Sequence, residues 1–235
     1  MKKFENAVSL GSFCSPAKEF ERIGRRECSL PFDWLITPEL KTVLRLMEVH
    51  FEDFLKEDLM YQLKDYPAYY RNVKWQVDFY HDFSPLASFD QQIGGVTEKY
   101  NRRIERFYQV ISRPTLFCRY LTLQDLPFVE EHYEEILAFL KSFNSQNEIL
   151  FVMNDDCPLP SRDLPIFTVP KDAHDTVARV FLKKNKDLHQ YVLESVDEKR
   201  MKKPNPFKKL FVLARKVYLK LRIQYGLIYR HSREL

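Results

Sequence analysis

Cys14 is the residue whose position in the sequence most favours chemistry. It ends the segment SLGSFC (9–14), between an apolar run at 8–10 and the dipeptide Ser15-Pro16, which is typical of a helix start. A thiol there lies near the positive end of the helix dipole, where unpaired amides stabilise a thiolate nucleophile. The same amides, with the turn at Ser12, can donate hydrogen bonds to a substrate oxyanion. The alternative is a cysteine that only packs, because cysteine is among the most buried residue types.

A general base is needed to activate such a thiol, and His81 is the best candidate. It follows an alternating apolar pattern at 73–79 and precedes Asp82, while Asp33 offers a second carboxylate that can orient the imidazole ring. His81 can instead be a strand-end histidine that bonds a loop carbonyl. The histidines in helical or charged surroundings are predicted to be surface residues: His50, His132, His174 and His189.

Other polar residues are candidates for substrate binding. Trp34, in the segment PFDW (31–34), can form a pocket wall, or Phe32 and Trp34 can anchor a loop in which Asp33 caps backbone amides. Arginines suit an anionic substrate group, although those on a helix can equally belong to a solvated face. Asn154 follows an apolar run, where α/β proteins place ligand-contacting loops. The arginine candidates are Arg102, Arg103 and Arg119.

The elements that must position these residues alternate along the chain. Apolar runs predict strands at 8–10, 73–79, 115–120, 148–153 and 165–169, with an irregular stretch at 61–70. Helical spacing predicts helices at 17–23, 40–55, 96–111, 126–143 and 176–196. This alternation predicts an α/β fold with a mostly parallel sheet and helices on both faces.

Three segments together resemble a known family. The blocks VSLGSFCSPAKEFERIGRRECSLPFDWLIT (8–37), HDF (81–83) and KYNRRIERF (99–107) resemble a bacterial family of unknown function described as papain-like cysteine peptidases. The resemblance covers about residues 6–155, and it implies Cys14 as nucleophile, His81 as base and Asp33 or Asp82 as orienting acid. It also implies an alternative fold, the papain-like α+β arrangement with an antiparallel sheet. Similar proteins occur near surface-polysaccharide synthesis functions, which implies a glycan or glycolipid intermediate as substrate.

Composition excludes several function classes. The chain has five glycines and neither a GxGxxG nor a P-loop pattern, and its four cysteines fit no zinc or haem spacing. We therefore expect neither a metal nor a cofactor. With no signal peptide and no run of about 18 apolar residues, we expect a cytoplasmic protein.

Charge divides the chain into two parts. The net charge is +4, but residues 199–235 carry +11, which leaves −7 on residues 1–198. We predict a single α/β domain over 1–198 and a basic tail over 199–235. Residues 207–229 have the spacing of an amphipathic basic helix, suited to an anionic membrane surface at the inner face of the membrane, to packing on the domain, or to a partner helix. Nucleic acid is not expected as a partner, because the body is acidic and shows no binding motif.

Three functional hypotheses follow. The first is a cysteine-dependent hydrolase or acyl transferase that acts on a peptide or glycan intermediate through Cys14 and His81. The second is a non-peptidase enzyme or accessory protein of bacterial surface-polysaccharide biosynthesis, glycosyltransferase-like, in which Cys14 is structural. The third is a membrane-peripheral scaffold whose function lies in the tail.

Overall fold

The computed structural model of the chain describes residues 4–22, 25–64, 66–158 and 160–169. The helix predicted at 176–196 and the basic segment 207–229 lie outside these residues, as does the predicted domain boundary after residue 198. Within the described ranges, no helix combines the length and the apolar character needed to cross a membrane.

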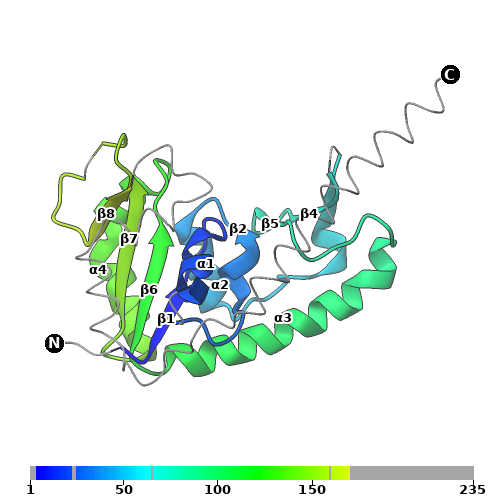
Figure 1. Cartoon of the computed structure of the whole chain (residues 1–235), viewed down its shortest axis with the longest axis horizontal. Helices are drawn as coiled ribbons and strands as arrows, with labels where there is room; N and C mark the ends of the chain where they lie inside the picture. The colour runs from blue at the N-terminus through cyan, green and yellow to red at the C-terminus, as the bar shows by residue number, and fades with distance from the viewer. Residues whose placement is uncertain (1–3, 23–24, 65, 159, 170–235) are drawn as a thin grey trace. The chain divides into compact units, whose positions relative to one another are not determined.

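Four strands form a parallel sheet, here called sheet A (Figure 1). Its strands lie in the order β1 (Asn6–Ser9), β6 (Thr115–Tyr120), β7 (Glu148–Asn154) and β8 (Ile166–Val169). Every residue of β6 is buried, as expected for a strand that is covered on both faces.

Helices cover both faces of sheet A. Phe117 of β6 shares one core with Ile136 of α4 (Leu126–Phe143). Its neighbour Cys118 points to the opposite face and shares a second core with Phe20 of α1 (Ser15–Arg22). The prediction of a parallel sheet between helices is confirmed for this part of the chain.

A second, antiparallel sheet, here called sheet B, corrects the prediction of one mostly parallel sheet. Its order is β2 (Leu35–Ile36), β5 (Val77–Phe79), β4 (Tyr66–Asn72) and β3 (Met60–Leu63). The stretch 61–70, expected to be irregular, therefore contributes to two strands. The alternating pattern at 73–79 spans a turn rather than one strand, because the Asn72 side chain accepts the Trp75 N–H at 3.0 Å and Gln76 has a φ of 52°. The fold is a mixed α/β fold with one parallel and one antiparallel sheet.

Two helices differ in length from the prediction. The helix α3 (Phe89–Ile111) begins before residue 96, because Ser88 and Gln91 form a capping box that starts it and leaves Gly94 inside. The helix α2 (Leu40–Glu48) ends before residue 55, where the chain turns through positive φ angles of 52° at His50 and 58° at Phe51.

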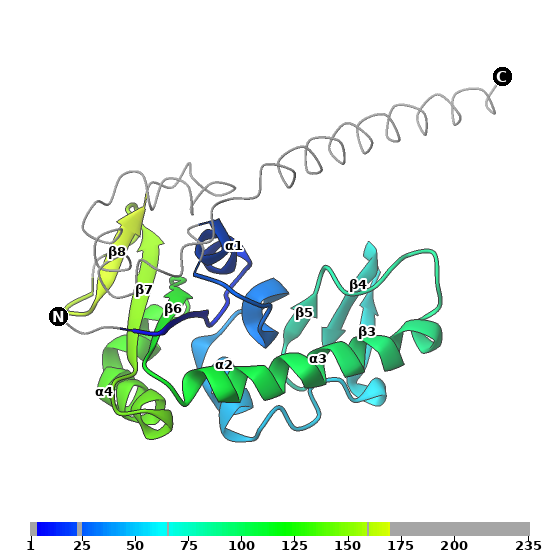
Figure 2. The same cartoon turned by 60° about the horizontal axis from the view of Figure 1, so that its bottom comes forward.

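The helix α3 packs against the buried face of sheet B, the face that carries Phe79. Figure 2 shows it running from beside β3 and β4 back toward the start of β6. Its Tyr100 is fully buried, with its ring 5.5 Å from the ring of Phe79 in β5 and 5.4 Å from that of Phe54. The residues that follow β5 therefore lie against α3.

The two sheets meet where β1 and β2 end. Thr37, directly after β2, donates its backbone N–H to the Ser12 carbonyl at 3.1 Å. Ser12 belongs to the turn after β1, so the turn that carries Cys14 lies beside the end of a sheet B strand.

Candidate functional site

A tight turn connects β1 to α1. Gly11 and Ser12 both have left-handed backbone angles, with φ of 79° and 67°. The Ser12 N–H donates to Thr37 Oγ1 at 3.0 Å, and the Gly11 N–H donates to Ser9 Oγ at 3.1 Å. A left-handed backbone conformation is strained for serine. These hydrogen bonds therefore stabilise a turn conformation that is otherwise unfavourable for this residue.

Cys14 stands at the N-terminus of α1 as predicted. Its carbonyl accepts the Lys18 N–H at 3.0 Å, which is a hydrogen bond of the first helical turn. The side chain is half-buried and forms no disulfide. The thiol therefore lies beside the helix N-terminus, where the backbone offers amide donors and the positive end of the dipole.

The exposed side chain of His81 lies within electrostatic range of Lys18 on the same helix. Burial lowers the pKa of His81, the Asp82 carboxylate raises it, and the ammonium of Lys18 on α1 lowers it. Its ring meets the ring of Trp34 edge to face, with centroids 5.9 Å apart. Within the described residues, no hydrogen bond joins Cys14 Sγ to the imidazole. The lowered pKa of His81 favours its neutral imidazole, the form that a general base requires.

Asp82 faces α3 rather than the imidazole. Its buried carboxylate accepts hydrogen bonds from Lys99 Nζ at 2.6 Å and the Tyr100 hydroxyl at 2.9 Å, with Arg103 Nη1 at 3.8 Å. Burial, with a further contribution from Asp82, holds the pKa of Tyr100 well above its usual value. These contacts tie the segment HDF to the segment KYNRR, two of the blocks that carry the family resemblance.

Asp33 is buried in the short 3-10 helix η1 (Pro31–Trp34). Its carboxylate accepts the Leu30 N–H at 2.9 Å and Arg26 Nη1 at 3.1 Å. Burial raises the pKa of Asp33, and these two partners oppose the shift. The guanidinium of Arg26 also lies over the Trp34 ring, 4.9 Å from its centroid. Asp33 therefore holds the loop that places Trp34 against His81.

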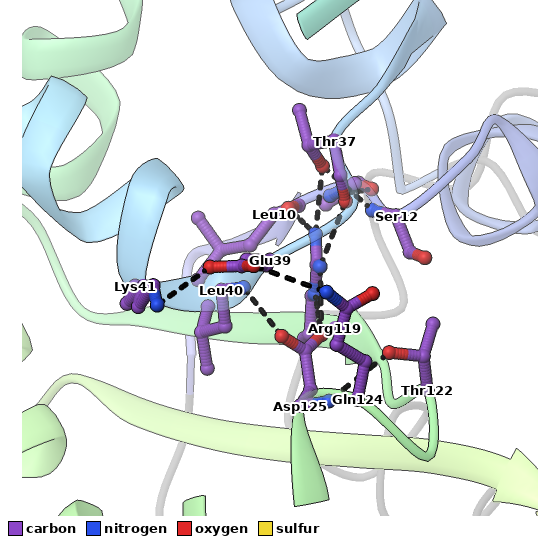
Figure 3. Close-up of polar contacts among 12 residues, drawn as sticks. Leu10, Ser12, Thr37, Glu39, Leu40, Lys41, Arg119, Thr122, Gln124 and Asp125 are labelled. Atoms are coloured by element: carbon purple, nitrogen blue, oxygen red, sulfur yellow. Dashed lines mark hydrogen bonds and ion pairs between the residues drawn. The ribbon is translucent and has the colours of Figure 1, made fainter. Parts of the chain in front are cut away.

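Arg119 is fully buried, and the protein uses all five of its N–H donors (Figure 3). The acceptors belong to Leu10, Thr37 and Asp125. Burial lowers the pKa of Arg119, and the Asp125 carboxylate opposes that shift. With every donor occupied within the protein, Arg119 offers none to a substrate.

The remaining candidates are spread over three places. Arg102 is exposed and lies 3.9 Å from Glu98 on α3, which fits a solvated face. Arg103 is largely buried, with its guanidinium carbon 4.8 Å from the centre of the Tyr100 ring. Asn154, at the end of β7, accepts a hydrogen bond from the Tyr120 hydroxyl at 2.7 Å.

Some residues of the site were not identified from the sequence. The Tyr120 ring lies 4.5 Å from that of Phe13, so Asn154 connects to the Cys14 turn through two aromatic rings. Neither Thr37 nor Asp125 is among the candidate residues identified from the sequence. The sequence feature that points to such partners is Arg119, since a charged residue within an apolar strand requires buried hydrogen-bond acceptors. In the described ranges, no group of three or more potential metal ligands is gathered.

Comparison with known proteins connects this site to a family. The model of the family described as "Putative papain-like cysteine peptidase (DUF1796)" matches residues 5–155, which include Cys14, Trp34 and His81. The chain is 27% identical over 164 residues to "Uncharacterized protein R408" of Acanthamoeba polyphaga mimivirus, covering 60% of this chain and 72% of that protein. No solved structure matches significantly. Since this relative is viral, the bacterial origin expected from the sequence stays a prediction.

Replacing Gly11 with alanine should destabilise the fold. An added Cβ would lie 2.6 Å from Thr37 Oγ1, on a backbone with φ of +79°. We expect the free energy of unfolding, measured by urea denaturation, to fall by roughly 2 kcal/mol or more. Gly94→Ala is the matched control, because an added Cβ there has nothing within 4 Å. That change inside α3 should stabilise the protein by up to about 1 kcal/mol, and equal effects of the two substitutions would contradict the steric account of the turn.

Proposed function

Since the chain belongs to the family described as "Putative papain-like cysteine peptidase", we propose that it is a cysteine-dependent hydrolase or acyl transferase. Cys14 is the nucleophile and His81 the base. The observation that carries the proposal is the left-handed turn at Gly11 and Ser12, which delivers the Cys14 thiol to the N-terminus of α1. A strained turn at that point is expected where the position of one side chain matters.

The proposed reaction uses groups from both sheets. His81 takes the thiol proton while Cys14 Sγ attacks the carbonyl carbon of an amide or ester. Backbone N–H groups at the start of α1 donate to the resulting oxyanion. When the tetrahedral intermediate collapses, the bond to the leaving amine or alcohol breaks and the imidazolium returns the proton to it. Water or another acceptor then gives a proton to His81 and takes the acyl group from Sγ, and the proton returns to the thiol.

Asp82 acts on His81 through its charge rather than through a hydrogen bond, because its carboxylate bonds Lys99 and Tyr100 of α3. Its negative charge raises the pKa of His81 and so stabilises the imidazolium that forms during the reaction. Asp33, whose carboxylate bonds Leu30 and Arg26, is not among the groups that shift the pKa of His81. In this proposal Trp34, whose ring meets that of His81, fixes the plane of the imidazole.

The test is the rate at which each cysteine is alkylated by iodoacetamide in the folded protein at pH 7, followed by mass spectrometry. Cys14 should react faster than Cys28, because burial raises the pKa of Cys28 and leaves less thiolate. It should also outpace Cys118, whose pKa burial raises to about 12. His81→Ala should slow Cys14 by roughly tenfold or more, because it removes the base.

The matched control for this test is His50→Ala. The His50 ring stacks on that of Tyr108, with centroids 4.9 Å apart, at the end of α2. This change should leave the Cys14 rate unaltered. A Cys14 rate that is the same with and without the imidazole of His81 would overturn the proposed pair.

We propose one second candidate, a glycan-binding protein of polysaccharide biosynthesis in which Cys14 is structural. Its support is a group of tyrosines in and beside sheet B, of which Tyr61 is 58% and Tyr66 54% exposed. The Tyr69 ring lies between two others, 5.1 Å from that of Tyr66 and 4.1 Å from that of Tyr80. Exposed aromatic groups of this kind mark surfaces that bind ligands.

Titration calorimetry with maltoheptaose and chitohexaose as probes tests this candidate. Binding should be measurable in the unmodified protein and lost in the double variant Tyr66→Ala, Tyr69→Ala, because the ring surface is removed. Leu86→Ala, at a side chain that is 83% exposed elsewhere, should bind as the unmodified protein does. The absence of any heat of binding, combined with fast alkylation of Cys14, would favour the cysteine enzyme.

A further inference from the structure

We infer that Arg119 is a positioning residue that fixes the Cys14 turn of sheet A against the end of β2 in sheet B, an inference that rests on the proposed function. Cys14 follows β1 of sheet A, whereas His81 follows β5 of sheet B. The nucleophile and the base therefore come from different sheets, and something must hold the two sheets in one relative position.

The guanidinium of Arg119 contacts both sides of this junction. Its Nη1 donates to the Leu10 carbonyl at 3.0 Å, after β1, and to Thr37 Oγ1 at 2.7 Å, after β2. Its Nη2 donates to the Thr37 carbonyl at 2.8 Å. The planar, rigid fork of arginine suits this geometry, because it holds several acceptors at fixed angles to one another.

Asp125 fixes the other edge of the guanidinium. One carboxylate oxygen accepts Arg119 Nε at 3.1 Å and Nη2 at 2.7 Å, and the other accepts the Leu40 N–H at 2.6 Å. Arg119 is 0% and Asp125 2% exposed. A buried ion pair of this kind tolerates little displacement. Any hydrogen bond that is lost leaves a buried donor or acceptor without a partner, which destabilises the folded state.

Thr37 carries this constraint to the nucleophile turn. Its hydroxyl oxygen accepts from Arg119 Nη1 and also from the Ser12 N–H at 3.0 Å, where Ser12 has φ of 67°. Thr37 is also close in sequence to Trp34, whose ring meets that of His81. The Thr37 hydroxyl group thus connects the buried arginine to the turn that presents Cys14, and the backbone of Thr37 follows the segment that contacts His81.

The experiment compares Thr37→Val with Thr37→Ser. Valine keeps the shape of threonine but removes the hydroxyl, whereas serine keeps it. Thr37→Val should lower the alkylation rate of Cys14 at pH 7 by about tenfold or more, since a misplaced reacting group loses at least that much. It should leave the Cys28 rate unchanged. Thr37→Ser should stay within roughly threefold of the unmodified protein, a difference below the effect of one displaced group.

Asn147→Ala controls for a general loss of stability. Asn147 is fully buried, and its side chain bonds Thr115, Ile111 and Leu140 at the start of β6 and β7, away from the Cys14 turn. It should reduce the urea midpoint while leaving the Cys14 rate unchanged. Arg119→Lys, which keeps the charge but loses the fork of donors, should slow Cys14 as Thr37→Val does.

The outcomes separate the inference from the function on which it rests. Fast labelling of Cys14 in both the unmodified and the Thr37→Val proteins overturns the positioning role alone. Equal slowing by Thr37→Val and Asn147→Ala also overturns it, because the effect would then be loss of stability. If Cys14 in the unmodified protein labels no faster than Cys28, the proposed function fails and the inference fails with it.

Discussion

A charged side chain that never meets solvent constrains both sheets of this protein. Arg119 has five N–H donors. Burying them without acceptors would cost more free energy than the net stability of a typical folded domain. The chain therefore has to bring two carbonyls, a hydroxyl and a carboxylate to one point, from the end of β1, the end of β2 and the start of α4. Meeting that requirement sets the relative position of the parallel and antiparallel sheets and the course of the turn before Cys14.

Sheet A could be predicted from the sequence, and sheet B largely could not. The central strands of sheet A, β6 and β7, are buried on both faces, and β7 appears as a continuous apolar run at 148–153. Sheet B pairs short strands with one exposed face, so its tyrosine-rich sequence at 61–70 resembles a loop. The alternation through Trp75 was misleading, because the Asn72 side chain closes a turn in the middle of it.

The positions of Cys14 and Trp34 followed from local signals, the helix start at Ser15-Pro16 and the PFDW segment. The partners of Asp82 could not be predicted in this way, because Lys99 and Tyr100 of α3 reach its carboxylate only in the folded chain. Arg119 was predicted to bind an anionic substrate group, because the sequence alone could not distinguish a substrate anion from Asp125. The structure distinguishes the two partners, because Arg119 is fully buried and a substrate cannot reach it.

We propose that Cys14 and His81 form one site across two sheets, and a short chemical cross-link tests their proximity. Dibromobimane becomes fluorescent when both of its arms react with thiols that lie close together. In a protein carrying His81→Cys with Cys28→Ser, Cys118→Ala and Cys157→Ser, we expect a bridge between Cys14 and the introduced thiol, and no bridge when His50→Cys replaces His81→Cys. A folded His81→Cys protein that bridges no better than the His50→Cys control would show that residues 14 and 81 belong to separate sites.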